Sequence, residues 1–162
     1  MRSKEEIPVV IAEIKEEMEK LEILVEKLLS QKGRTGDEEV AESASLRLHN
    51  FYTGCERIFK LVASEVNGAI PRELDWHRRL LTQMAIDIEG VRPPVISRET
   101  MKGLEELLRF RHVVRNIYGY ELESARIEDM ISLLTGLYRR FVEEVGVFIS
   151  FLDGVHQQSS KA

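Results

Sequence analysis

Apolar residues recur at intervals of three and four along most of the chain, which is the period of an amphipathic α-helix. The first such run starts near Lys4 and stops near the turn-forming sequence QKGRTG, residues 31–36. A second run follows Asp37, which can cap a helix, and stops at Asn67-Gly68. The pattern therefore predicts two long helices in the N-terminal half.

The same period continues beyond the second run. Pro71 is expected to open a third helix that includes Leu74 and Ile88 and stops before Gly90. The two adjacent prolines in the segment 91–97 exclude a helix there, so this segment is predicted to be an extended link.

Two further helices complete the pattern. Ser97 is expected to cap a fourth helix that ends near Gly119, and a fifth helix is predicted from about Ser124 to Gly154. Five helices with short connections predict an all-α fold, an up-and-down helical bundle.

Length and composition favour one domain. The 162 residues, 43% of them hydrophobic, suffice for a single core, expected at residues 4–154 of a domain spanning 1–162 with a polar tail at 155–162. The chain has no membrane-length apolar run and no signal-peptide core, which predicts a cytoplasmic protein without a membrane partner. Its lone Cys55 cannot form an internal disulfide, and no zinc-type spacing occurs, so neither a metal nor a cofactor is expected.

Positive charge is concentrated in one short stretch. The formal net charge is −5, yet RFRHVVRN, residues 109–116, holds three arginines and a histidine. On a helical wheel, Arg111, Arg115 and Tyr118 extend the line of the core-facing Leu104. Because an unpaired guanidinium is costly to bury, the arginines on that line must face acidic residues, a solvated cleft or an anionic ligand.

Two interpretations of these arginines remain open. Arg109, Arg111 and Arg115 can complement the dipole at the helix C-terminus and pair with acidic neighbours, as in a bundle adaptor whose arginines are structural. Alternatively, their guanidinium groups can bind phosphate oxygens in pairs while Tyr118 stacks on a base, which predicts an RNA site with Arg109 and Arg115 as binding residues.

The spacing of Arg111, His112, Asn116 and Tyr118 resembles the motif of HepT-like ribonuclease toxins in the HEPN superfamily. That motif has an arginine, a polar residue, three more positions, a histidine, one residue and a tyrosine. Three other blocks also resemble this family, and together the resemblance covers about residues 40–140. These blocks are YTGCERIFKLVA (52–63), IPRELDWHRRLLTQM (70–84) and GVRPPVIS (90–97).

The resemblance implies a helical bundle that forms a homodimer, with two copies of the motif in one cleft. It also implies a metal-independent endoribonuclease that acts as the toxin of a toxin–antitoxin pair. The partner would be a minimal nucleotidyltransferase antitoxin that can adenylylate Tyr118. Carried over by position, Arg111 would stabilise the charge on the phosphate, and Asn116 would occupy the acid–base position.

Asn116 departs from the family pattern, because the motif has a histidine there. An amide does not exchange protons near neutral pH, whereas an imidazole does. His112 lies four residues earlier on the same helical face and is the candidate substitute. The alternative is a catalytically weak or silent HEPN module that binds RNA or a nucleotidyltransferase partner.

Trp76 and His77 form a second place where an imidazole could lie at a cleft. An aromatic anchor beside a surface histidine is the favoured interpretation, because Trp is usually well buried and His intermediate.

Overall fold

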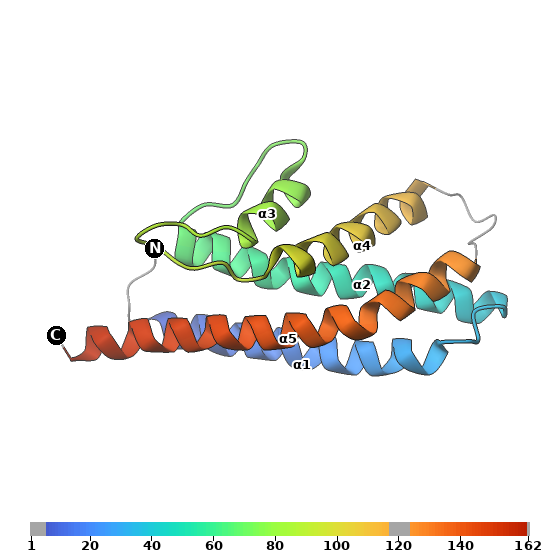
Figure 1. The fold of residues 1–162 in the computed structure, drawn as a ribbon, viewed down its shortest axis with the longest axis horizontal. Helices are drawn as coiled ribbons and strands as arrows, with labels where there is room; N and C mark the ends of the chain where they lie inside the picture. Colours follow the sequence, from blue (N-terminus) through green and yellow to red (C-terminus); the bar gives the residue numbers. More distant parts are fainter. Residues whose placement is uncertain (1–5, 117–123, 162) are drawn as a thin grey trace.

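The computed structural model describes residues 6–116 and 124–161, and at 111–116 it describes the helical backbone without the side chains. The predicted end of the fourth helix near Gly119 therefore lies outside the described residues. The all-α bundle is confirmed (Figure 1). The helices are α1 (Ile7–Gln31), α2 (Glu38–Val62), α3 (Trp76–Met84), α4 (Arg98–Asn116) and α5 (Ser124–Ser160).

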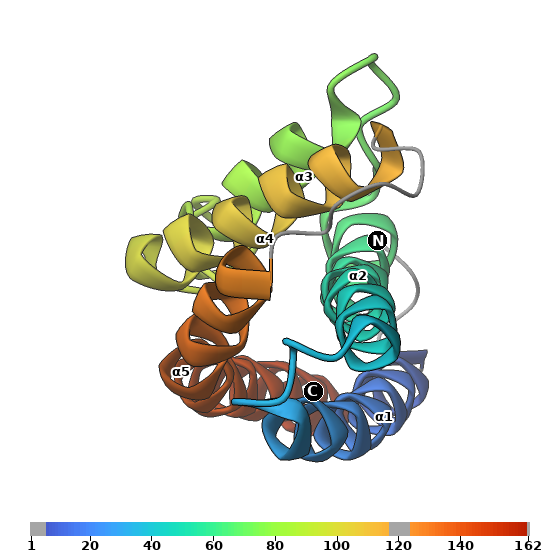
Figure 2. The same ribbon diagram turned by 90° about the vertical axis from the view of Figure 1, so that its right-hand side faces the viewer.

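Four long helices surround the apolar core, and the short α3 lies outside them (Figure 2). Helix α1 packs against α2 and α5, and α4 packs against α2 and α5 from the other side. Helix α3 packs on both α2 and α4. The helix that carries the basic stretch therefore forms one wall of the bundle and is flanked by α3.

The start of α2 lies where the sequence predicts it. The Asp37 carboxylate accepts a hydrogen bond from the Glu39 peptide N–H at 2.9 Å, as a helix cap does. The loop before it is tied to α5, because the Thr35 hydroxyl donates to the Glu128 carboxylate at 2.7 Å. The hydrogen bond from Thr35 is the main cause that lowers the pKa of Glu128. This loop is thus fixed by side-chain bonds at both of its ends.

The end of α2 is extended by a π-helical turn, η2 (Ala63–Asn67). The chain then leaves the helix at Gly68, whose φ of +88° lies in the left-handed region that glycine adopts without strain. The Ala69 N–H closes the turn on the Ala63 carbonyl at 3.0 Å. The predicted stop at Asn67-Gly68 is confirmed.

The prediction for the third helix was wrong at both ends. Helix α3 begins at Trp76, five residues after Pro71, and it ends at Met84. Leu74, expected on the apolar face, is fully exposed, so nothing packs on it to hold a helix there. Ile88 lies beyond the helix in an isolated antiparallel bridge.

The early end of α3 has a physical cause in the returning chain. The buried Arg92 guanidinium donates to the Gln83 carbonyl at 3.0 Å, and the Val95 N–H donates to the Met84 carbonyl at 2.8 Å. These carbonyls belong to the last turn of α3, where no following helical N–H is available to them. The segment 91–97 that supplies both donors is non-helical, as predicted.

Helix α5 is longer than predicted. It continues through Gly154 to Ser160, so the expected polar tail 155–162 is helical as far as that residue. Leu152 is buried and Val155 packs on the core, which offsets the roughly 1 kcal/mol that a glycine costs inside a helix. Over residues 6–116 and 124–161, no helix is both long enough and apolar enough to cross a membrane.

Candidate functional site

The start of α4 is held by a polar cluster that includes α5. The Ser97 hydroxyl accepts the Thr100 N–H at 3.2 Å, which confirms Ser97 as the helix cap. Glu144 of α5 accepts the Thr100 hydroxyl at 3.0 Å and the Ser97 N–H at 3.2 Å. Both oxygens of one carboxylate therefore fix where α4 begins.

The first half of α4 is fixed by close packing. A Cβ atom at Gly103 would lie 2.7 Å from Cδ1 of Leu137, so glycine lets α4 approach α5 closely. Leu104, Leu107 and Phe110 are buried in the core. Leu104 and Leu107 confirm the core-facing line predicted for this half, whereas Phe110 lies about 120° away from Leu104 on the helical wheel.

The motif positions follow directly on the same helix. Arg111, His112, Arg115 and Asn116 occupy the last turns of α4, but their side chains lie outside the described part, and Tyr118 lies outside the described residues altogether. Their backbone is helical as far as Asn116, so Arg111 and Arg115 are about one turn apart. The predicted cleft therefore remains a prediction.

Arg109 is the one residue of the predicted site whose side chain is described. It is 61% exposed and forms ion pairs within its own helix, to Glu106 at 2.9 Å and to Glu105 at 4.0 Å. Exposed pairs of this kind contribute at most about 0.5 kcal/mol. A phosphate group can therefore displace the two carboxylates at small cost.

A second polar group lies between α2 and α3. The Glu56 side chain is only 4% exposed, and its Oε2 lies 2.6 Å from Nδ1 of His77, which is 29% exposed. The imidazole stacks on the Trp76 ring at a centroid distance of 3.6 Å. The Lys60 ammonium lies 4.5 Å from the centre of the same indole.

This stack borders an open groove of about 600 Å³. Lys60, Arg72, Ser64 and Trp76 are among its lining residues, and no acidic residue of the described chain lines it. An adjoining groove shares Lys60 and Ser64 but is bordered by acids of α1. The first groove is therefore the more favourable of the two for an anion.

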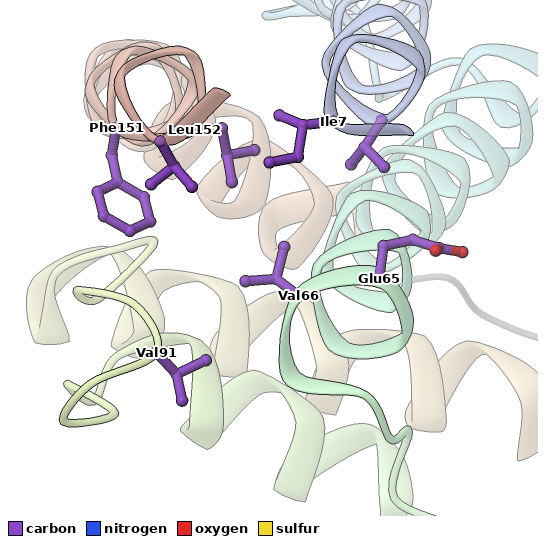
Figure 3. Close-up of a pocket in the computed structure, with 8 residues that line it drawn as sticks. Ile7, Glu65, Val66, Val91, Phe151 and Leu152 are labelled. Atoms are coloured by element: carbon purple, nitrogen blue, oxygen red, sulfur yellow. The ribbon is translucent and has the colours of Figure 1, made fainter. Parts of the chain in front are cut away.

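A small pocket near the same end of the bundle, where η2 follows α2, has a different character. Figure 3 shows Ile7, Val66, Phe151 and Leu152 converging on it, while the Glu65 carboxylate points away. Its volume of about 30 Å³ corresponds to roughly one water molecule. With an apolar lining and so little space, it belongs to the packing of the core.

Cys55 is excluded as a nucleophile by its surroundings. Burial raises the pKa of its thiol well above the ordinary value, so the reactive thiolate is not formed. Among the residues that the structure describes, no three His, Cys, Asp or Glu side chains converge as metal ligands do.

Comparison with known families decides which group of proteins this bundle belongs to. The family model described as "HepT-like protein" matches residues 43–152, more than half of the chain. The chain belongs to the HepT-like family. Searches of curated proteins and of solved structures gave no significant match. The resemblance found in the motif and in three sequence blocks is thereby confirmed.

The matched region of this HepT-like chain extends from α2 into α5 and includes both polar groups described above. The sequence interpretation of Trp76 as an aromatic anchor agrees with its packing on the core, but His77 is more than a surface histidine. Glu56 was missed entirely. One signal was present, because Glu56 lies four residues after Tyr52 and three before Phe59, on the apolar face of its helix.

Proposed function

We propose that this HepT-like protein is a metal-independent endoribonuclease that cleaves RNA in a cleft between two copies of the chain. We further propose that it is the toxin of a toxin–antitoxin pair. The observation that carries the proposal is the family match, which includes the basic stretch 109–116 of a protein with net charge −5. Guanidinium groups bind phosphodiesters well because they pair with two oxygens at once.

Each motif residue has a role in this proposal. Arg111 stabilises the negative charge that builds up on the phosphate as the 2′-hydroxyl attacks. His112 supplies an imidazole for proton transfer, since Asn116 cannot exchange protons near neutral pH. Arg109 and Arg115 hold neighbouring phosphates of the RNA.

The test is RNA cleavage by the purified protein in the presence of EDTA. We expect products that end in a 2′,3′-cyclic phosphate, and we expect Arg111→Ala to lower their rate of formation by roughly 10²–10³-fold. Arg139→Ala is the matched control, because Arg139 is an exposed arginine of α5, paired only to Glu143 among the described residues. Loss of cleavage in both variants would remove the assignment of Arg111.

The alternative is a silent module that binds RNA or a nucleotidyltransferase without cutting. Asn116 at the histidine position of the motif favours it, because the acid–base group expected there is missing. Asn116→His separates the two functions. If the wild-type protein binds RNA and leaves it intact while Asn116→His cleaves it, the silent module is the correct assignment.

The toxin role needs a partner of its own. We propose that a minimal nucleotidyltransferase adenylylates Tyr118 and thereby blocks the cleft. Co-expression of the two proteins should add one adenylyl group to the chain, measured by mass spectrometry, and Tyr118→Phe should prevent the addition. An unmodified wild-type chain that is nevertheless inhibited would contradict the modification but not the pairing.

A further inference from the structure

The Glu56–His77 pair has the geometry of a carboxylate that orients an imidazole. The carboxylate of Glu56 is buried, and within the described part of the chain its hydrogen-bond partner is Nδ1 of His77, at 2.6 Å. In the neutral ring this contact places the proton on Nδ1, because a carboxylate only accepts. The lone pair is then on Nε2, for which the described residues supply no hydrogen-bond partner.

The ring is also held in place on its face. Trp76 stacks on it at a centroid distance of 3.6 Å with an angle of 28° between the planes, and the Lys60 ammonium lies 4.5 Å from the centre of the indole. A half-exposed imidazole with one nitrogen oriented by an acid and the other unbonded suits proton transfer, since a base must reach its proton with a lone pair. If the pair served only to hold α2 and α3 together, the hydrogen bond between Glu56 and His77 would be enough.

We propose that His77, oriented by Glu56, is the general base of RNA cleavage, which makes this inference dependent on the proposed function. Nε2 of His77 takes the proton of the 2′-hydroxyl as the bond between the 2′ oxygen and phosphorus forms. The bond between phosphorus and the 5′ oxygen breaks, and that oxygen takes a proton from the His112 imidazolium. Water then restores both histidines to their starting protonation states. The products are a 2′,3′-cyclic phosphate and a 5′-hydroxyl.

His77 lies on a helix that is next to the motif helix. Helix α3 packs on α4, the helix that carries the motif, and both lie on the side of the bundle away from α1 (Figures 1 and 2). Trp76 lines the groove that has Lys60 and Arg72 for the phosphates of the substrate, and His77 stacks on the Trp76 ring. Carboxylates of α1 border the adjoining groove and repel a polyanion from that direction.

The decisive variant is His77→Asn. The side-chain amide nitrogen of asparagine takes the place of Nδ1 and can still donate to Glu56, whereas nothing replaces Nε2. We expect the maximal cleavage rate to fall by about 10²–10⁴-fold with little change in RNA affinity or in the melting temperature. Glu56→Gln should have a smaller effect, because it removes the orienting charge but keeps the imidazole. His156→Ala, which removes a half-buried histidine of α5, should cleave like the wild type.

A second measurement excludes a purely structural role. In His77→Ala, added imidazole should restore part of the cleavage, while a structural loss would not respond to a soluble base. Wild-type cleavage by His77→Asn would overturn this inference and leave the proposed function intact. Loss of activity in both variants together with a lowered melting temperature and no rescue would also overturn it. If the wild-type protein cleaves no RNA, both proposals fail.

Discussion

Glu144 and Glu56 are two of the carboxylates that connect neighbouring helices of this bundle, and they are satisfied in different ways. Glu144 accepts the Ser97 N–H with one oxygen and the Thr100 hydroxyl with the other, so the cluster at the start of α4 is closed. Glu56 meets only one nitrogen of His77, and among the described residues the other nitrogen has no partner. The second group therefore retains one position for an outside hydrogen bond.

This difference distinguishes a cluster with a structural role from a group that is a candidate for taking part in a reaction. In the first group both carboxylate oxygens supply partners that a helix start would otherwise lack. A polar atom that lacks a protein partner but reaches solvent is available to a substrate. Of these two groups, the Glu56–His77 pair is therefore the one to test for function.

The largest stability effect is expected where the pair between α2 and α3 is broken. His77→Ala leaves the buried Glu56 carboxylate without its partner and should lower the free energy of unfolding by about 3 kcal/mol. The double variant Glu56→Leu/His77→Leu should recover most of that loss, because no buried charge remains. Urea denaturation measures both. If the double variant is as unstable as His77→Ala, the Glu56 carboxylate in His77→Ala is hydrated, and it is not a buried charge without a partner.

A smaller loss is expected from opening the closed cluster. Glu144→Ala removes the acceptor of the buried Thr100 hydroxyl and of the Ser97 N–H, which should cost about 2 kcal/mol. Because this cluster is structural, RNA cleavage at a temperature well below melting should be unchanged. Thermal melting and the cleavage assay are read on the same sample. A loss of cleavage without a loss of stability would put this cluster into the functional site.

The same contrast explains which features the sequence could predict. The caps Asp37 and Ser97 act within three residues, so a local pattern was enough to find them. Glu56 depends on a partner 21 residues away, and no local pattern encodes that distance. The end of α3 was misplaced for the same reason, because Arg92 reaches it from the returning chain. For the predicted site, the motif correctly indicated the family, while the cleft itself depends on side chains outside the described part.

The smallest change in the free energy of unfolding is expected at an exposed ion pair. Arg109 is charged and lies closer to Glu106, at 2.9 Å, than to Glu105, yet it is 61% exposed. Arg109→Ala should therefore change the free energy of unfolding by no more than about 0.5 kcal/mol. If Arg109 binds RNA, the same variant should weaken binding and reduce its dependence on salt by about one phosphate contact. If RNA binding by the wild type and by Arg109→Ala depends equally on salt, Arg109 does not contact a phosphate. RNA binding would then be confined to the later turns of α4.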